Sequence, residues 1–176
     1  MSDSVFLDLD QTLEFVWSKL TKVESVPPVV LATSSECGAS ARMVVLRAAN
    51  REAQGLEIWC HAKSRKINEL ISDPHAEILV WLADRQLQIR IKTKIEVSEG
   101  SNGIWDTLGK GSRLNYAQFP SAGETISNPE TSAPVPDVNL FRVLNCHVLT
   151  IETLWLGGMP HRRAVFDGNS SIWIAP

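Results

Sequence analysis

The sequence has few cysteines and no arrangement of them that would stabilise a fold covalently. Its three cysteines, Cys37, Cys60 and Cys146, are odd in number and widely spaced, and none forms a C-x-x-C pair. This pattern does not predict a disulfide framework or a structural zinc site. Two of them precede a histidine, but neighbours on a strand point to opposite faces and cannot easily chelate one ion. We therefore expect buried thiols and no metal.

Long apolar runs and an excess of basic residues are also missing. No apolar run approaches the roughly 20 residues needed to span a bilayer, and no charged segment followed by an apolar one opens the chain as a secretion signal would. The net charge of -3 argues against a nucleic-acid-binding protein with a broad basic surface, so any anion site must be local. We expect a cytoplasmic protein without nucleic-acid or membrane partners.

The chain does contain enough apolar sequence for a folded core. Its 176 residues are 44% hydrophobic, which fits one domain, residues 1–176, without disulfides or metal. Short apolar runs rich in β-branched residues predict strands at 29–33, 42–48, 56–60, 76–82, 86–97, 141–153, 161–166 and 171–175. Connections as short as those at 34–38 and 50–55 favour antiparallel neighbours. Many such strands with few helices predict a small barrel.

Two helices and one long loop complete the expected elements. Apolar residues recur every three or four positions after the possible N-caps Asp8 and Asp10, which predicts an amphipathic helix. A short helix is predicted from Ser64, and the segment 102–118 is expected to be helical in pieces. The stretch 120–139 is rich in Pro, Ser, Thr and Gly and is expected to form a long loop.

The start of the second helix carries an unusual charge pattern. Arg65 and Lys66 lie in its first turn, where the helix dipole favours anions over cations. With Ser64 as the N-cap, free backbone N–H groups and both side chains could converge on one phosphate. The alternative is that both side chains point into water and that Arg65 pairs with Glu69 one turn later.

A strand with an arginine near each end precedes this helix. Arg42 and Arg47 should point to opposite faces, and taken alone they are also consistent with solvated residues at a strand's rim. The strands at 42–48 and 56–60 and the helix from Ser64 form a compact β-β-α unit, in which the Arg42 strand could end near the helix N-terminus. Two or three cations with helix N–H groups would balance a phosphate monoester of about -1.5 to -2 charge.

Four motifs follow one another in a recognisable order. They are Arg42 to Arg47, Cys60-His61 before Ser64-Arg65-Lys66, Gln88-Ile89-Arg90, and Trp155 followed by Gly157-Gly158 and His161-Arg162-Arg163. In order and spacing they resemble the FMN-binding split barrels related to pyridoxamine 5'-phosphate oxidase. The resemblance implies a mainly β (α+β) fold, an antiparallel split β-barrel of about six or more strands with flanking short helices.

The resemblance also implies a set of cofactor-binding residues. They are Arg42, Met43, Val44, Val45, Leu46, Arg47, Cys60, His61, Ser64, Arg65, Lys66, Gln88, Trp155, Arg162 and Arg163. Arg42, Arg65 and Lys66 would hold the FMN phosphate. Gln88 and Trp155 match positions that reach the flavin from the partner subunit, because the family binds FMN at a homodimer interface. Without the resemblance, Gln88 would be a solvent-facing strand residue and Trp155 a core aromatic.

The substrate side departs from the oxidase pattern. By the resemblance, the flavin ring would lie against the backbone of 43–46 and 60–61. Where the oxidase has a lysine in contact with flavin and substrate, this chain has Arg47, a larger planar cation. An Arg-Leu-His-Asp-Arg segment of the oxidase is replaced by the sequence at 161–165, and only Ser112 remains of its substrate-phosphate segment. We therefore expect an altered substrate site and no efficient pyridoxamine phosphate oxidation.

Four hypotheses for function follow from these patterns. The leading one is an FMN-dependent oxidoreductase that acts on an unknown small molecule, with the flavin performing the electron transfer. A flavin-binding carrier or sensor without turnover would keep the phosphate site and need no substrate pocket. The same barrel could instead hold a deazaflavin or haem, and a structural protein without a ligand is the fourth possibility.

Overall fold

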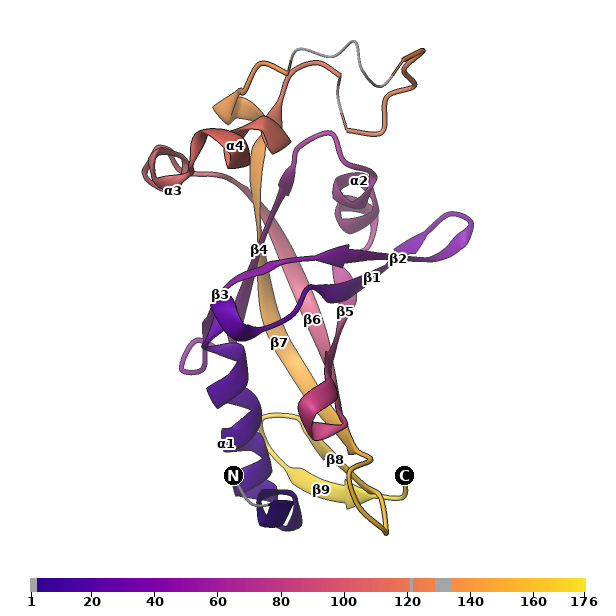
Figure 1. Cartoon of the computed structure of the whole chain (residues 1–176). Coiled ribbons are helices and arrows are strands. Elements are labelled where there is room, and N and C mark those ends of the chain that lie inside the picture. The colour runs from indigo at the N-terminus through magenta and orange to yellow at the C-terminus, as the bar shows by residue number, and fades with distance from the viewer. Residues whose placement is uncertain (1–2, 121, 129–133) are drawn as a thin grey trace.

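An antiparallel sheet of nine strands forms the centre of the protein (Figure 1). The computed structural model describes residues 3–120, 122–128 and 134–176. Its strands are β1 (Val29–Ser35), β2 (Gly38–Val44), β3 (Leu46–Asn50), β4 (Gly55–His61), β5 (His75–Leu82), β6 (Leu87–Glu99), β7 (Phe141–Trp155), β8 (Arg162–Phe166) and β9 (Ser171–Ile174). The hydrogen-bonded path runs β2-β1-β5-β6-β7-β4-β3, with β8 on β7 and β9 on β8. This confirms the predicted mainly β, antiparallel architecture.

The strand predicted at 42–48 is divided in two. Val45 separates β2 from β3, and the pairing of β3 with β4 shifts register between Leu46 and Ala48. The chain therefore changes partner at Val45, from β1 to β4. Because β2 and β3 stand at the two ends of the hydrogen-bonded path, this bend closes the path into a barrel. A local apolar pattern does not reveal such a change of partner, so the sequence predicted one strand.

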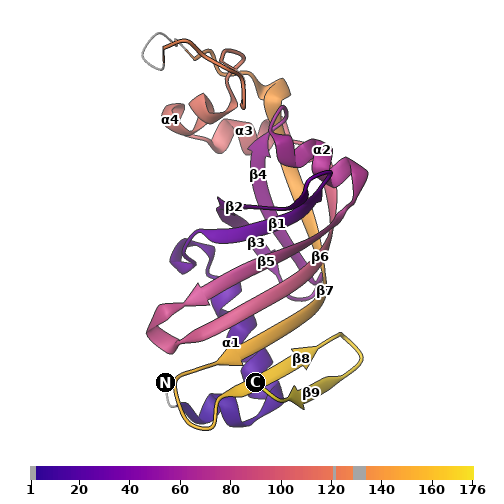
Figure 2. The ribbon, with the colours of Figure 1, turned by 90° about the vertical axis from the view of Figure 1, so that its right-hand side faces the viewer.

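The two longest strands, β6 and β7, pair along almost their whole length. Their register runs from Leu87 opposite Trp155 to Glu99 opposite Arg142. The alternation predicted for β6 is confirmed, because Leu87, Ile89, Ile91, Thr93 and Ile95 are all buried while the intervening residues are polar and more exposed. Figure 2 shows these strands running from the α2 end of the molecule towards β8 and β9.

The two predicted helices are present. The N-terminal helix α1 (Leu9–Leu20) starts after Asp8, whose carboxylate accepts a hydrogen bond from the Gln11 N–H at 2.8 Å, which selects Asp8 from the two candidate caps. Its apolar face, including Trp17 and Leu20, belongs to the same buried cluster as the inward residues of the strands. The short helix α2 (Arg65–Ser72) follows β4 and contacts β1 and β6.

Short helical segments between β6 and β7 form a group that we call the cap, residues 102–120. It contains α3 (Asn102–Thr107), α4 (Lys110–Arg113) and η4 (Leu114–Tyr116), which confirms the prediction of a segment helical in pieces. Tyr116 packs with Phe141 in a second apolar cluster at this end of the barrel. Of the loop predicted at 120–139, residues 121 and 129–133 lie outside the described residues.

The remaining helical turns lie between larger elements. They are η1 (Asp3–Leu7), η2 (Val23–Ser25), η3 (Ala83–Arg85) and η6 (Val138–Leu140). The first described residues, in η1, and the C-terminus lie near β8 and β9, at the opposite end of the sheet from the cap (Figure 1). Within the described part of the chain, no helix has both the length and the apolar composition that a membrane crossing requires.

Candidate functional site

The first turn of α2 combines unsatisfied backbone donors with two cations. Ser64 occupies the N-cap position, as predicted, but its hydroxyl makes no hydrogen bond to the helix backbone. The hydroxyl instead accepts a hydrogen bond from Lys66 Nζ at 2.9 Å. A helix leaves its first N–H groups without α-helical partners. The Ile67 N–H donates to the Ser64 carbonyl at 2.9 Å, but the Ser64 side chain satisfies neither of the two N–H groups that precede that of Ile67. The helix start therefore keeps donors for an external acceptor.

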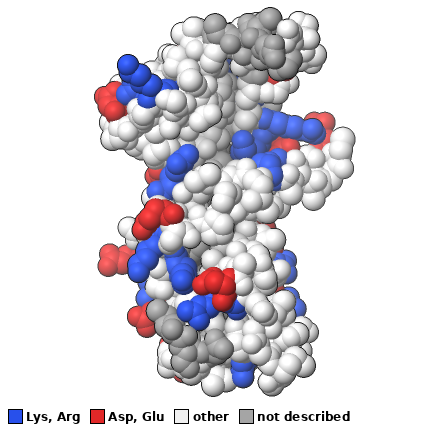
Figure 3. Space-filling model, in the orientation of Figure 1, with Lys and Arg blue, Asp and Glu red and all other residues white. Residues whose placement is uncertain are grey.

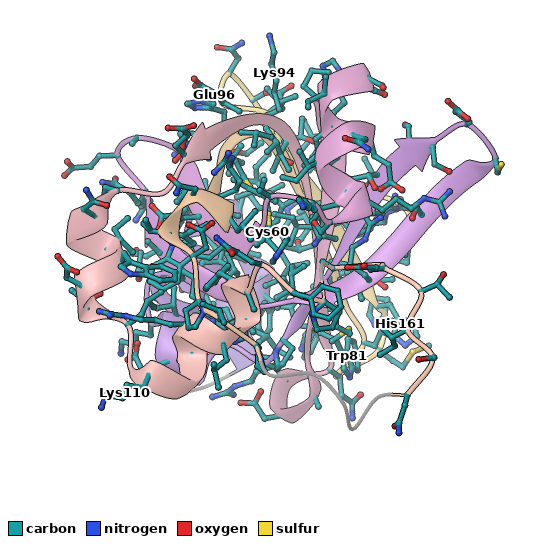
Figure 4. All side chains as sticks on the ribbon, turned by 90° about the horizontal axis from the view of Figure 1, so that it is seen from above. Cys60, Trp81, Lys94, Glu96, Lys110 and His161 are labelled. Atoms are coloured by element: carbon teal, nitrogen blue, oxygen red, sulfur yellow. The ribbon has the colours of Figure 1, made fainter. Side chains whose placement is uncertain are left out.

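Lys66 lies half-buried beside the end of β4. Burial lowers the pKa of its ammonium from the ordinary lysine value, and the charge of Arg42 acts in the same direction, against the opposing effects of Cys60 and Glu69. Burial also raises the pKa of the Cys60 thiol, which Lys66 and Ser64 partly offset. Figure 4 shows Cys60 near the middle of the molecule when it is seen from above. An ammonium withdrawn from water in this way is stabilised by an anionic ligand.

Arg42 is held by contacts within the protein. Its Nη1 donates to Thr33 Oγ1 at 2.5 Å and, more loosely, to the Leu31 carbonyl at 3.4 Å. Its Nη2 donates to Ser40 Oγ at 2.7 Å and to Glu69 Oε2 at 2.5 Å. These contacts use both terminal nitrogens and connect β2 to β1 and α2. Arg42 is therefore a fixed positive charge behind the start of α2, with its Nε–H outside these four contacts.

Glu69 lies between the two arginines of the predicted phosphate site. Its Oε2 accepts hydrogen bonds from Arg42 and from Thr33 Oγ1, the latter at 2.6 Å. Its Oε1 is 3.3 Å from Arg65 Nε, so the alternative pairing considered for Arg65 is present. Burial by itself would raise the pKa of Glu69, but the hydrogen bonds from Thr33 and Arg42 and the charge of Arg42 hold it below the usual value. Glu69 is therefore ionised near neutral pH.

Figure 3 shows Lys and Arg atoms gathered where α2 meets the β1–β2 hairpin, with carboxylates beside them. The groove between these elements has a volume of about 300 Å³ and is lined by one cation, Arg65, and by the carboxylates of Glu36, Glu69 and Asp73, so the cations gather at its edge and not within it. The gathering of Lys and Arg side chains at one place agrees with the expectation that an anion site in this acidic protein occupies a small part of its surface.

The bend between β2 and β3 presents apolar side chains to the surface. Met43 is 61% exposed and Val45 is 43% exposed, whereas Leu46 is buried and Val44 packs against the core. Large apolar side chains exposed close together are typical of a surface that contacts a ligand or a partner. The predicted ring-binding strand thus offers apolar contacts on its outer side.

Arg47 and His61 already have partners within the protein, and His61 also contacts the cap. The guanidinium of Arg47 lies over the ring of Trp59, with its central carbon 5.0 Å from the ring centroid. His61 is buried; its Nε2 lies 3.0 Å from the Ala117 carbonyl, and its Nδ1 accepts a hydrogen bond from the Lys63 N–H at 3.0 Å. These partners assign the hydrogen to Nε2. His61 therefore ties the loop before α2 to the cap.

The other predicted site residues lie on a different part of the sheet. Gln88 lies near the start of β6, opposite Leu154. Trp155, at the end of β7, is only 5% exposed and stacks on Phe6, with ring centroids 5.2 Å apart. The central guanidinium carbon of Arg162 lies over the Trp155 ring, 4.9 Å from its centroid. In one chain these residues are grouped towards β8 and η1, away from α2.

Arg163 belongs to a row of charges across the outer face of the sheet. It donates to Glu152 at 2.8 Å, and Glu152 also pairs with Arg90 at 3.2 Å. Arg90 pairs in turn with Glu77 at 2.7 Å. A single chain therefore brings Arg42, Ser64, Arg65 and Lys66 together near Cys60, and it does not bring them to Gln88, Trp155, Arg162 or Arg163.

Two residues of the site were not predicted. Glu69 was considered only as a surface partner of Arg65, although its position four residues later on the helix was a usable signal. Thr33 had no local signal, because its partners Arg42 and Glu69 are distant in sequence. In the described ranges, no three His, Cys, Asp or Glu side chains are grouped as a metal site.

Comparison with solved structures defines the fold class. A pyridoxamine 5'-phosphate oxidase-related, FMN binding protein from Nostoc punctiforme PCC 73102 is 19% identical, with a TM-score of 0.74 over 100% of this chain and 99% of that one. PhzG from Burkholderia lata 383, solved in complex with tetrahydrophenazine-1-carboxylic acid, is 20% identical, with a TM-score of 0.75 over 100% of this chain and 98% of that one. At these identities the likeness shows the fold alone. The predicted split barrel is confirmed.

Sequence comparison then identifies the family. Residues 9–99, just over half of the chain, match the family model described as pyridoxamine 5'-phosphate oxidase, FMN-binding domain. The protein therefore belongs to this family, which confirms the resemblance. A pyridoxine/pyridoxamine 5'-phosphate oxidase from Nostoc sp. (strain PCC 7120 / SAG 25.82 / UTEX 2576) is 37% identical over 79 residues, 44% of this chain. That match spans 36% of the length of the curated relative.

Proposed function

We propose that this protein binds FMN and holds the FMN phosphate at the N-terminus of α2. The observation that carries the proposal is the grouping of Arg65 and Lys66 at a helix start whose N–H groups the Ser64 hydroxyl leaves unsatisfied. Lys66 is half-buried and next to the fixed charge of Arg42. Cations and N–H donors on one small surface fit a phosphate monoester. The membership of an FMN-binding family supports the same ligand.

The flavin ring would lie on the outer side of the β2–β3 bend. The exposed Met43 and Val45 would cover apolar ring surface there, and the adjacent ends of β2 and β4 would supply backbone groups for its polar edge. When bound, the flavin would supply electron transfer, while the protein supplies binding, orientation and exclusion of water. The oxidase name of the curated relative supports an oxidoreductase that acts on a small molecule not yet identified.

We propose further that the working unit is a homodimer with FMN at its interface, built from a single domain spanning 1–176 and located in the cytoplasm. Gln88, Trp155 and the arginines of β8 lie away from α2 within one chain, so a second chain is needed to bring such residues to the same flavin. The exposed Met43 and Val45 are consistent with a surface that a partner covers.

A second candidate is a flavin-binding carrier or sensor. Two observations favour it. Arg47, where the oxidase has lysine, lies over Trp59, and Arg163 is paired with Glu152, so both cations already have partners in the protein. A chain whose substrate-side cations are engaged in this way would bind flavin without requiring a substrate.

Purification tests the flavin proposal directly. We expect a yellow protein whose absorption spectrum is that of a flavin and which releases FMN on denaturation, identified by chromatography. A colourless protein that cannot be reconstituted with FMN, or one with a haem or deazaflavin spectrum, would contradict it. Light scattering of the loaded protein should give twice the mass of one chain. Screening nicotinamide cofactors and small amines for reduction of the bound flavin then separates an enzyme from a carrier.

A further inference from the structure

We infer that Glu69 is a positioning residue for the phosphate site, which holds Arg42 and Arg65 in place around the N-terminus of α2. The inference rests on the proposed binding of FMN and assigns a role that the family motif does not contain. A carboxylate beside an anion site is unexpected, because it repels the ligand that the site should attract. Its geometry explains why it is there.

Glu69 joins the three elements that surround the site. It lies in the second turn of α2 and is only 6% exposed. Its Oε2 accepts hydrogen bonds from Thr33 of β1 and Arg42 of β2, and its Oε1 faces Arg65 Nε at 3.3 Å. Oε1 has no other polar partner among the described residues. One buried carboxylate therefore links the β1–β2 hairpin to Arg65 in the first turn of α2.

The two arginines are affected differently. Arg42 is immobilised, because both of its terminal nitrogens are engaged by the protein and Glu69 supplies the charged acceptor among them. Arg65 has a side chain that is 74% exposed, and Glu69 contacts it through Nε. That contact leaves the terminal nitrogens of Arg65 for a ligand and restricts the directions in which they can point.

The charges of the site agree with this role. Arg42, Arg65 and Lys66 less the Glu69 carboxylate leave a net charge of about +2, which matches the roughly -1.5 to -2 of a phosphate monoester. Without Glu69, two guanidinium groups and an ammonium would repel one another in the absence of ligand. The carboxylate therefore weakens the attraction for phosphate slightly. It also keeps the cations close together in the ligand-free protein, because it offsets their mutual repulsion.

The test compares FMN with riboflavin, which has the same ring system and no phosphate. The ratio of their dissociation constants reports the contribution of the phosphate alone. In Glu69→Gln we expect the preference for FMN to fall about tenfold, the equivalent of one well-aligned charge-assisted hydrogen bond, while riboflavin binding changes by less than about twofold. The matched control is Glu77→Gln, which removes a carboxylate paired with Arg90 outside the site and should leave the preference unchanged.

A second variant covers the case in which Glu69→Gln does not fold. Thr33→Val retains every charge and removes one hydroxyl, which donates to Glu69 and accepts from Arg42, so it loosens the same group without deleting the carboxylate, and a smaller loss of preference, about threefold, is expected. An unchanged or increased preference for FMN in either folded variant would overturn the inference and leave Glu69 as a purely structural link. Failure of the parent protein to bind either flavin would instead refute the proposed function.

Discussion

Replacing Lys66 with methionine should remove most of the preference for FMN over riboflavin. Methionine has a stem of similar length without the charge, so it should keep the packing of this half-buried side chain. In the proposed complex, the change deletes a cation next to the phosphate. It leaves in place the backbone N–H groups of α2 and the guanidinium groups of Arg42 and Arg65.

The size of the effect follows from the surroundings of Lys66. A hydrogen bond to a charged group contributes roughly 1.5–3 kcal/mol, which corresponds to about 10- to 150-fold in the dissociation constant. We expect the upper half of this range, because burial has already removed part of the competing water. The same burial disfavours the ammonium in the ligand-free protein. The methionine variant should therefore be at least as stable as the parent towards urea.

The assay is a titration of flavin fluorescence with each protein, using FMN and riboflavin in parallel. Lys22→Met is the matched control, because Lys22 is exposed, lies beyond the end of α1 and is not part of the cation cluster at the start of α2. The control should keep the FMN preference of the parent. Retention of that preference within about twofold in the Lys66 variant, with the fold intact, would refute the assignment of Lys66 to the phosphate.

Three further results are expected. FMN affinity should fall as the pH rises through the lowered pKa of Lys66, because phosphate binds the protonated ammonium. The variant Lys66→Arg should show a flatter fall, since a guanidinium keeps its charge. Flavin titrations at alkaline pH measure the affinity of both proteins. Trp155→Ala should lower the free energy of unfolding by about 3–5 kcal/mol in urea denaturation, because the ring is almost fully buried. A disulfide reagent should modify one thiol of the native ligand-free protein, the exposed Cys37. Cys60 and Cys146 are buried, and burial raises the pKa of Cys146 to about 12, so both should react only on unfolding.

For each of these three predictions, one outcome would contradict the physical argument behind it. A flat pH profile in the parent protein would mean that Lys66 does not meet the phosphate. A loss below about 1 kcal/mol for the Trp155 variant would mean that this ring is not a core residue in solution. Rapid reaction of a second native thiol would show that the end of β4 or the middle of β7 opens readily.

Much of the architecture was predictable because burial leaves a periodic pattern in sequence. The alternation along 86–97 predicted β6, and the three- and four-residue spacing after Asp8 predicted α1. Short connections predicted the antiparallel hairpins. The bend at Val45 was missed, because Val44 and Leu46 on either side of it keep the apolar character of one strand and the change of partner is visible only in the sheet.

The candidate site was predictable only in part, for a similar reason. Arg65 and Lys66 stood out because cations in a first helical turn oppose the helix dipole. The turn of the Ser64 hydroxyl towards Lys66 was not predicted, since a serine before a helix ordinarily caps it. Trp155 has the sequence context of a flavin contact, yet within one chain it is buried against Phe6.

The sequence by itself determined most of the secondary structure, the order of the family motifs and the location of two cations at a helix start. Only the tertiary structure decided that Thr33, Arg42 and Glu69 form one hydrogen-bonded group behind them. The physical reason is that periodicity records which side of an element is buried, whereas strand register and the approach of a helix decide which buried polar groups meet. A carboxylate that seemed to be a surface partner of Arg65 thereby became the buried link between two arginines.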